Sequence, residues 1–427
     1  MARKMKDSGI EWIGVIPEGW RTINPKALFT QRKDKAQKGE RQLTSSQQYG
    51  ILYQDDYMEL TGSKVVTVEK DFDILKHVEA GDFVISMRSF QGGLEYSTKS
   101  GAISSAYVML VPNLELVYPR FYRWLLKSSV YIDALQRTTN MVRDGQAMRY
   151  SNFAQVRLFT LPLDEQKSRA DFLDLECSSI DKILFKTRSS IEEYKKLKQA
   201  VITQAVTKGV RGEREMKDSG VGWIGAIPKD WEIKRLKSFC TIVDCKNRTP
   251  DVFPDGKYTV VRTTCIKDCS FSYEGSYQTD TTNFKAWTLK GQPHKGDIFF
   301  TREAPVGEAC LVPNADNLCM GQRVMFFRPE DNSDARYIMY SIYGPLVREY
   351  IASKNSGSTV GHLKLGQVAC IPIFYCPPLE QKEIADYLDA KCAEIAGLIA
   401  KKEQLVKELE NYKKSLIYEV VTGKREV

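Results

Sequence analysis

Several features of membrane proteins and of familiar enzymes are missing from the sequence. No apolar stretch approaches the roughly 18 residues that span a bilayer, and the N-terminal MARKMKD is polar and lacks the apolar core of a signal peptide. No phosphate-binding G-x-x-x-x-G-K-[ST] motif is present, and the three histidines, His77, His294 and His362, have neither metal-site nor triad-like spacing. We therefore expect a cytoplasmic protein without catalytic or metal-binding residues of its own.

Cysteine is scarce in the first half, where Cys177 is the only one of the ten in the chain. Four others fall close together in the second half, at Cys240, Cys245, Cys265 and Cys269. Their spacings are looser than the paired C-x2-C of a zinc ribbon, and the first half has no matching set. We expect buried thiols here, with structural zinc as the alternative.

Length and charge are compatible with several classes of protein. A chain of 427 residues is long enough for two or three domains, and 42% hydrophobic and 27% charged residues are ordinary for a soluble globular protein. Lys and Arg number 62 against 54 acidic residues, which gives a formal charge of +8 and a pI near 8.8. This mild basicity is compatible with a polyanionic partner but does not require one.

The sequence contains an internal repeat. Residues 5–20 read MKDSGIEWIGVIPEGW and residues 216–231 read MKDSGVGWIGAIPKDW, with eleven of the sixteen positions identical. A second matching pair closes each half: PLDEQK at 162–167 with ADFLD at 170–174, and PPLEQK at 377–382 with ADYLD at 385–389. Each half therefore has a similar frame around an insert that differs from its counterpart.

The second copy of the opening contains GVGWIG at 220–225, which fits the letters of a dinucleotide-binding G-x-G-x-x-G motif. Glu11 stands where the second copy has Gly222, and neither copy lies between a clear strand and a helix. We interpret the segment as a packing motif. Its expected anchors are four tryptophans, Trp12, Trp20, Trp223 and Trp231.

A long helix is predicted after each insert. Apolar residues, together with Thr187 and Tyr194, mostly recur in alternating steps of three and four positions, which is typical of the buried seam of a coiled coil. Lys198 and Lys413 interrupt the two seams at equivalent positions. The seam residues are Ile180, Leu184, Thr187, Ile191, Tyr194 and Val201 in the first copy, and Ile395, Ile399, Val406, Leu409, Leu416 and Val420 in the second. Two such stripes in one chain favour pairing of the two helices over two unrelated surface helices, because each stripe must be buried. A helix over 166–206 would extend on the order of 60 Å at 1.5 Å per residue.

The inserts have the pattern of mixed α/β domains. Short β-rich runs at 82–86, 107–111 and 297–301 alternate with Gly, Pro and Asn turns. Helical patches are predicted near 119–136 and 334–353.

The MKDSG-x-x-WIG-x-IP-x-x-W openings and the closings from P-L-x-E-Q-K to A-D-[FY]-L-D resemble the specificity subunit of type I restriction–modification enzymes. The likeness covers essentially the whole chain, and both diagnostic segments occur twice. It implies an α+β fold with two mixed α/β target recognition domains, separated by two long helices that pair as an antiparallel coiled coil. The implied order is a first target recognition domain at 1–162, a first helix at 163–210, a second target recognition domain at 211–378 and a second helix at 379–427.

The same resemblance implies a sequence-specific DNA-binding subunit that performs no catalysis itself. Each domain would read one half of a bipartite double-stranded DNA site, and because the inserts differ, the site would be asymmetric. The frame would dock two modification (methyltransferase) subunits, which restriction (translocase/nuclease) subunits join. S-adenosylmethionine, ATP and Mg are then expected on these partners and none in this chain. A fixed spacer permits base contacts about one turn of B-DNA apart, or a multiple of it.

Candidate DNA contacts are polar residues near points where the inserts can be aligned, such as Gly81-Asp82 with Gly296-Asp297. Gln and Arg can each make two bonds to adenine or guanine, whereas Ser and Tyr suit single contacts or phosphates. The candidates in the first insert are Arg88, Ser89, Gln91, Ser104, Ser105, Tyr107, Arg143 and Gln146. Those in the second are Lys246, Arg248, Thr249, Arg262, Thr263, Arg302, Gln322 and Arg323. For each, the alternative is a solvated surface residue.

Two other functional classes stay open. One is a catalytic DNA methyltransferase or nuclease component whose motifs are unrecognised. The other is a coiled-coil scaffold with no role in nucleic-acid binding.

Overall fold

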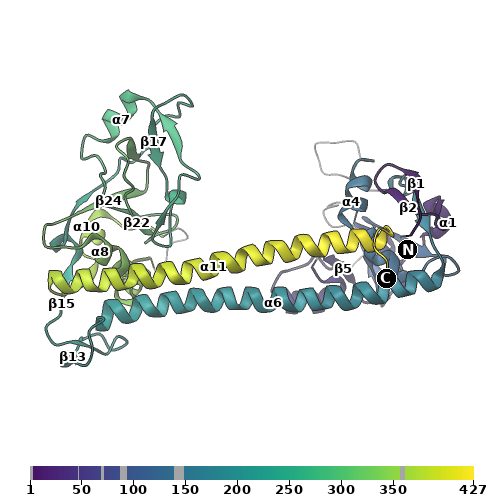
Figure 1. The fold of residues 1–427 in the computed structure, drawn as a ribbon, viewed down its shortest axis with the longest axis horizontal. Coiled ribbons are helices and arrows are strands. Elements are labelled where there is room, and N and C mark those ends of the chain that lie inside the picture. The colour runs from purple at the N-terminus through teal and green to yellow at the C-terminus, as the bar shows by residue number, and fades with distance from the viewer. Residues whose placement is uncertain (1–2, 47, 69–71, 87–93, 139–148, 356–360) are drawn as a thin grey trace. The chain divides into compact units, whose positions relative to one another are not determined.

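The computed structural model describes residues 3–46, 48–68, 72–86, 94–138, 149–355 and 361–427. The chain folds as two compact units (Figure 1), the first formed by residues 1–188 and 404–427 and the second by residues 189–403. Two long helices, α6 (Leu163–Lys208) and α11 (Pro378–Val421), are shared by both units.

The first unit is centred on a four-stranded antiparallel sheet in the order β4-β11-β8-β9. Besides the helices that it shares, its elements are β1 (Met5–Ile10), β2 (Gly14–Pro17), β3 (Arg21–Ile23), α1 (Pro25–Leu28), β4 (Phe29–Arg32), β5 (Leu43–Ser46), β6 (Gly50–Tyr53), α2 (Gln54–Thr61), the 3-10 helix η1 (Phe72–Ile74), β7 (Lys76–Val78), β8 (Phe83–Ser86), β9 (Leu94–Tyr96), β10 (Gly101–Ile103), β11 (Tyr107–Pro112), α3 (Pro119–Leu126), α4 (Ser129–Gln136), α5 (Tyr150–Phe153) and β12 (Leu158–Thr160).

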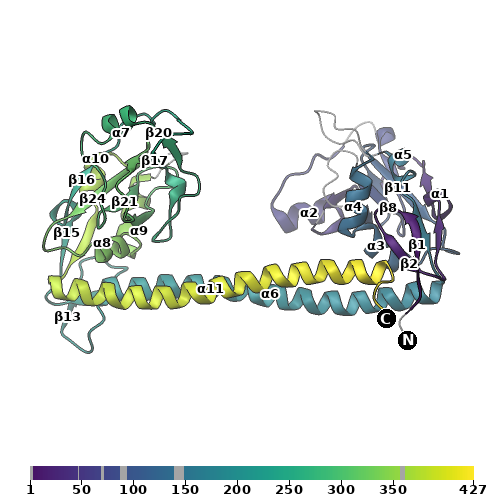
Figure 2. The ribbon, with the colours of Figure 1, turned by 45° about the horizontal axis from the view of Figure 1, so that its top comes forward.

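The second unit has a matching four-stranded sheet in the order β16-β24-β21-β22 (Figure 2). Its own elements are β13 (Met216–Asp218), β14 (Ala226–Pro228), β15 (Glu232–Arg235), η2 (Leu236–Ser238), β16 (Cys240–Val243), β17 (Tyr258–Val261), η3 (Thr263–Cys265), β18 (Ile266–Lys267), β19 (Ser270–Phe271), β20 (Tyr277–Thr279), α7 (Thr281–Trp287), β21 (Ile298–Thr301), β22 (Ala309–Leu311), β23 (Leu318–Met320), β24 (Val324–Pro329), α8 (Ala335–Ile342), α9 (Pro345–Asn355), α10 (Leu365–Ala369) and β25 (Pro372–Tyr375).

The two units share one topology in their frames. The hairpin β1–β2 corresponds to β13–β14, and the antiparallel pair β3–β12 corresponds to β15–β25. The inserts differ outside the four-stranded sheet: the first unit adds the pairs β5–β6 and β7–β10, and the second adds the three-stranded sheet β20-β17-β23. The predicted β-rich runs and helical patches are confirmed, each helical patch as two short helices.

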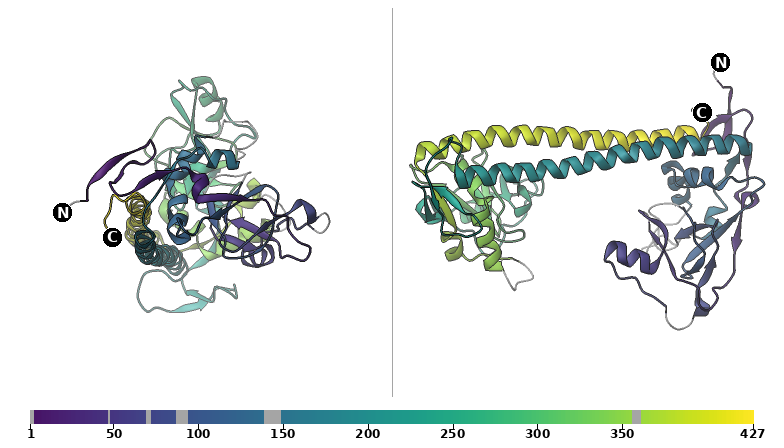
Figure 3. Two further views of the ribbon diagram at one scale, coloured as in Figure 1. Left: turned by 90° about the vertical axis from the view of Figure 1, so that its right-hand side faces the viewer. Right: turned by 90° about the horizontal axis from the view of Figure 1, so that it is seen from below.

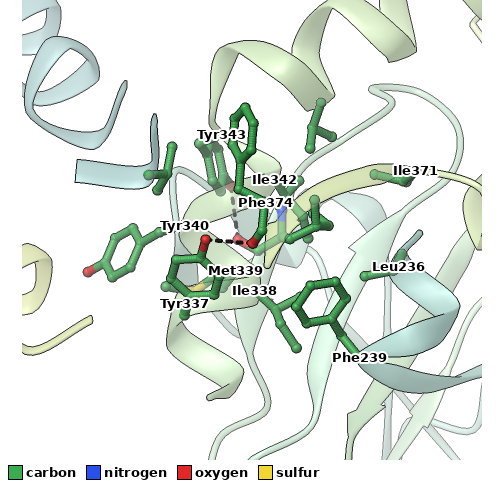
Figure 4. Close-up of a cluster of buried hydrophobic side chains, with 14 of the residues drawn as sticks. Leu236, Phe239, Tyr337, Ile338, Met339, Tyr340, Ile342, Tyr343, Ile371 and Phe374 are labelled. Carbon is green, nitrogen blue, oxygen red and sulfur yellow. Dashed lines mark hydrogen bonds between the residues drawn. The ribbon is translucent and has the colours of Figure 1, made fainter. Parts of the chain in front are cut away.

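The two central strands are apolar on both faces because both faces are covered. Val108, Met109 and Leu110 of β11 are buried, as are the four residues 324–327 of β24. Continuous apolar runs of this kind are typical of strands inside a core. The buried cluster of the second unit packs around α8, where the Tyr337 hydroxyl donates to the Phe374 carbonyl at 2.7 Å (Figure 4).

The repeated E-Q pair at the start of each long helix has a structural role. Gln166 is fully buried; its Nε2 donates to the Leu161 carbonyl at 2.9 Å, and its Oε1 accepts from the Tyr118 amide at 2.7 Å. Gln381 makes the matching bonds, to the Cys376 carbonyl at 2.9 Å and from the Asp334 amide at 3.1 Å. In each unit one buried side-chain amide thus links the start of the long helix to two other segments by hydrogen bonds. The E-Q pair occurs twice because both units use this link.

The predicted antiparallel pairing of the long helices is confirmed (Figures 1 and 3). In the first unit Ile180 and Leu184 of α6 are buried in the same cluster as Leu416 and Val420 of α11. Lys413, which interrupts the seam, places Nζ 2.6 Å from Oδ1 of Asp181 on the partner helix. The interruption is therefore an ion pair between the two helices.

In the second unit the seam departs from the predicted positions. Ile202 and Ala205 of α6 are buried with Leu388 and Cys392 of α11, whereas Val201 is only half-buried. Different positions of α6 are buried here because the helix packs on the core of the unit as well as on α11. Lys198, the second interruption, donates to the carbonyl of Asp268 at 3.3 Å.

The repeated tryptophans are not all anchors. Trp20 and Trp231 are fully buried, and Trp12 packs edge-on to Tyr131 with ring centroids 5.5 Å apart. Trp223, however, is 53% exposed, so the expectation that it anchors the second hairpin is wrong. It lines a cavity beside α6 with Lys196 and Gln204, whereas Trp12 lies against the aromatic residues of its own unit.

Three of the four clustered cysteines, Cys240, Cys245 and Cys265, are buried. Burial raises the pKa of all four thiols, that of Cys269 to about 12. In the part of the chain that the structure describes, no group of three or more His, Cys, Asp or Glu side chains is placed to hold a metal ion.

Candidate nucleic-acid interface

The strand register brings several loops of the second unit to one end of its four-stranded sheet. Val243, the last residue of β16, pairs with Phe326, and Thr301, the last residue of β21, pairs with Val324 at the start of β24. The segments that follow β16 and β21 therefore lie beside the turn that precedes β24. Backbone bonds add a fourth segment, because the Leu363 amide donates to the Arg302 carbonyl at 3.0 Å. We call residues 244–249, 302–308, 321–323 and 361–363 the polar edge.

A fifth segment with predicted contacts joins the polar edge through the second sheet. β17 runs parallel to β23, and the amide of Gly321 donates to the carbonyl of Val261 at 2.8 Å. Arg262 and Thr263 follow directly, as the N-cap and the first residue of the 3-10 helix η3. The Arg262 side chain is exposed, and its Nη1 donates to the Gly275 carbonyl at 3.4 Å.

Arg302 forms an ion pair inside the polar edge. Its Nη1 donates to both carboxylate oxygens of Asp244, at 3.1 and 3.2 Å, and its Nη2 donates to Oδ1 of Asn247 at 3.4 Å. Only 12% of the Arg302 side chain is exposed. The geometry suits an arginine that fixes the loop after β16 better than one that reaches a base.

Arg323 and Gln322 occupy the turn before β24. Arg323 has a left-handed backbone with φ 81°, and its side chain is 48% exposed. Its Nε lies 2.6 Å from Oε2 of Glu303. Gln322 is half-buried beside it. An exposed guanidinium with a half-buried amide next to it has the donors and acceptors that base edges can bond.

Lys246 and Arg248 lie against the ring of Trp287 at the end of α7. Lys246 Nζ is 4.7 Å and Arg248 Cζ is 5.3 Å from the ring centroid. The indole Nε1 donates to the Arg248 carbonyl at 3.1 Å, which holds the loop in place. Cation–π contacts of this kind order long basic side chains without neutralising them. Both cations thus suit phosphate contacts.

Thr249 is exposed at the end of the same loop. The next residue, Pro250, accepts a bond at 2.7 Å from the hydroxyl of Tyr277, and burial raises the pKa of that hydroxyl. All eight candidates of the second insert therefore lie on the polar edge or in the adjoining residues 262–263 at the start of η3.

Three of the eight candidate DNA contacts in the first insert lie among the described residues. Ser104 and Ser105 are exposed in the turn before β11, which corresponds to the turn before β24; the strand register places Ser105 at the position of Gln322. The ring of Tyr107 is half-buried against a cluster that includes Leu43 and Met109. The remaining candidates, Arg88, Ser89, Gln91, Arg143 and Gln146, lie outside the described residues.

Glu303 and His362 were not among the sequence candidates, yet both belong to the polar edge. Glu303 pairs with Arg323 and with His362. The sequence carries one usable signal, since Glu303 directly follows Arg302 after a buried strand. It carries none for His362, which the fold alone brings to Glu303.

The described residues thus form two α+β units that share a pair of long helices, with polar loops gathered at one end of the four-stranded sheet of the second unit. Residues 228–408 match the family model described as the type I restriction modification DNA specificity domain. No helix in the described part of the chain is long and apolar enough to cross a membrane.

Two relatives come from Methanocaldococcus jannaschii. The type I restriction enzyme MjaVIII specificity subunit is 23% identical over 360 residues, which are 81% of this chain and 80% of the relative. The MjaIX specificity subunit is 26% identical over 182 residues, 42% of this chain and 41% of the relative. The fold matches a chain from a structural study of assembly of the type I restriction–modification system, with a TM-score of 0.69, 14% identity and coverage of 96% of this chain and 99% of that one. Residues 228–408 thus carry the type I restriction modification DNA specificity domain, and most of the chain is similar to type I restriction enzyme specificity subunits.

Proposed function

We propose that this chain is the sequence-specific DNA-binding subunit of a type I restriction–modification complex. It recognises an asymmetric bipartite site in double-stranded DNA and holds the modification and restriction subunits together. The observation that carries the proposal is the polar edge: loops far apart in the sequence converge at the end of one sheet, on a frame that occurs twice in the chain.

Each insert reads its own half-site. Residues 1–162 and 211–378 serve as the two target recognition domains, and the helical segments 163–210 and 379–427 connect them. The inserts differ both in their added strands and in the turn before the central strand, where one has Ser104 and Ser105 and the other Gln322 and Arg323. Different side chains at equivalent places favour different base sequences, so the site is asymmetric.

The chain itself performs no catalysis in this proposal. Two modification subunits carry S-adenosylmethionine and the methyl transfer, and restriction subunits carry ATP, Mg and DNA cleavage. The complex works in the cytoplasm, where its DNA is. Cys177, the single thiol of the first half, supports the view that the thiols have structural roles, because burial raises its pKa to about 11 and keeps it from acting as a nucleophile.

The test is a genome-wide map of methylated adenines in cells with and without this gene. We expect one bipartite motif with an unread gap to lose its methylation when the gene is deleted. Methyl transfer, ATP hydrolysis or DNA cleavage by the purified chain, free of partner subunits, would instead identify a catalytic component. Unchanged methylation, together with no DNA retained by the assembled complex, would leave the chain as a scaffold.

A further inference from the structure

Glu303 is the residue at which three segments of the polar edge meet. Its backbone forms an isolated bridge with His362, ahead of α10. Its Oε2 lies 2.6 Å from Nε of Arg323, and its Oε1 pairs with Nδ1 of His362. Only 21% of the Glu303 side chain is exposed, so the carboxylate is largely enclosed.

The backbone around this carboxylate is held as well. The Arg302 amide donates to the Arg323 carbonyl at 3.0 Å, and the Leu363 amide donates to the Arg302 carbonyl at 3.0 Å. The left-handed φ of 81° at Arg323 is uncommon for a residue with a Cβ. Uncommon backbone geometry persists where the surroundings fix it, and such residues concentrate at functional sites.

An acidic side chain at a DNA-binding edge needs an explanation, because phosphates repel it. Here the carboxylate has Arg323 on one oxygen and His362 on the other. The contact with Arg323 uses Nε, the guanidinium nitrogen nearest the main chain. The two terminal nitrogens are the ones from which a guanine edge can accept a pair of bonds.

We propose that Glu303 is a positioning residue for the second half-site. It fixes the guanidinium of Arg323 where a guanine can accept its bonds, and its charge lowers the affinity of that edge for phosphates of any sequence. The inference rests on the proposed function. It predicts two effects of opposite sign when the carboxylate is removed: weaker discrimination at one base pair and tighter binding to non-specific DNA.

The test uses the full chain assembled with its modification subunits. Methylation-site sequencing gives the motif, and binding to a random-sequence duplex at several salt concentrations gives the non-specific affinity. We expect Glu303→Gln to relax the preference at one base pair of the second half-site by about tenfold, the loss of one well-placed contact. Non-specific affinity should rise, because a negative charge near the phosphates is gone. Glu303→Asp, which keeps the charge, should retain part of the preference.

Two controls separate positioning from other roles. Glu330→Gln makes the same charge change at the far end of the same sheet, next to the last residue of β24, and should alter neither quantity. In the Arg323→Ala background, Glu303→Gln should cause no further loss of preference, since it acts through Arg323. A further loss in that background would mean that Glu303 contacts a base itself and would overturn the positioning role.

The two proposals fail in different ways. If the unaltered complex shows no bipartite motif, the proposed function fails. If it shows the motif and Glu303→Gln keeps the second half-site unchanged while the variant folds normally, only the role of Glu303 fails. A Glu303→Gln variant that loses its thermal transition is replaced by Glu303→Asp, which keeps the charge on a shorter side chain. If the Asp carboxylate no longer contacts Arg323 and the preference at the second half-site is still unchanged, the positioning role is overturned.

Discussion

The indole Nε1 of Trp20 donates a hydrogen bond to Oε2 of Glu165 at 3.1 Å, across 145 positions of sequence. The second half repeats the pair, with Trp231 Nε1 at 3.2 Å from Oε2 of Glu380. An arginine joins each pair, as Arg3 contacts Glu165 and Arg214 contacts Glu380. In each half the tryptophan belongs to the opening segment of the repeat and the glutamate to the closing segment. The two segments recur together because they contact each other in the fold.

Glu165 makes the stability of the first unit dependent on pH. Burial alone would raise its pKa, but hydrogen bonds from Arg3, Arg169 and Trp20 outweigh burial and hold the pKa at about 2, below its usual 4.5. A depressed folded-state pKa stabilises the fold above the unfolded-state value, and the contribution is lost as the pH falls from 4.5 towards 2. The contribution at neutral pH is on the order of 2–3 kcal/mol.

Glu165→Gln should therefore destabilise the protein at pH 7 and have little effect near pH 2. Urea unfolding of both proteins across this range measures the difference in the free energy of unfolding. An equal difference at all pH values would show that the carboxylate contributes through packing and not through its charge.

The two hairpin tryptophans should differ in their effect on stability. Trp12 packs on Tyr131 and donates to the Arg157 carbonyl at 3.2 Å, whereas Trp223 is 53% exposed. Trp12→Ala should cost about 2 kcal/mol, less than a fully buried tryptophan, and Trp223→Ala should stay within about 0.5 kcal/mol. Thermal unfolding of the two variants side by side checks this, and equal losses would mean that the second hairpin packs in solution as the first does.

Arg169 distinguishes the first unit from the second. Its side chain is 1% exposed and donates to the carbonyls of Val420 at 2.8 Å and Arg425 at 2.9 Å, where α11 ends. Ile384 stands at the equivalent place in the second half, after PPLEQK. Arg169→Met leaves Glu165 and two buried carbonyls with fewer donors and should cost about 3 kcal/mol.

Hydrogen exchange is the measurement that locates this effect. The amides of residues 416–421 should exchange faster in Arg169→Met, while those of the matching end of α6 keep their protection. Faster exchange at both helix ends would indicate a general loss of stability and contradict a local role for Arg169.

Much of the frame could be predicted from the sequence because its signals are local. The repeated openings, the E-Q pairs and the alternating stripe from Ile180 to Ile191 each mark an element by its own residues. The order of the sheet strands could not be predicted, since β4 and β11 pair across many residues without any local mark.

The site was predictable only in part, for the same reason. Gln322 and Arg323 stand out as polar residues next to a buried strand, and both lie on the polar edge. Arg302 stands out equally, but its contact with Asp244 is made by the fold, and it turns an exposed candidate into a nearly buried one. His362 lies beside Glu303 because the backbone of residues 362–363 pairs with that of residues 302–303. No local sequence pattern marks this pairing.

Lys246 and Arg248 should contribute to affinity without contributing to sequence choice. Both are held against Trp287 and suit phosphates. Replacing either with Ala should weaken binding to specific and random duplexes alike and lower the slope of log affinity against log salt by about 1. Salt titrations of the assembled complex measure the slope. A change in the methylated motif would show that the altered residue reads a base.

Gln322 and Arg323 should contribute to sequence choice more than to general affinity. They lie in the turn before β24, with the side chain of Gln322 half-buried and that of Arg323 partly exposed. Each good two-bond contact with a base discriminates by about 1–3 kcal/mol, so replacing both with Ala should relax one half-site by about tens of fold or more. The half-site read by the first insert should keep its preference, since Ser104, Ser105 and the rest of that insert are unchanged. Methylation-site sequencing of the assembled complex reports both halves at once. An unchanged second half-site would remove these residues from the reading surface, and a change in the first half-site would mean that the inserts are assigned to the wrong halves.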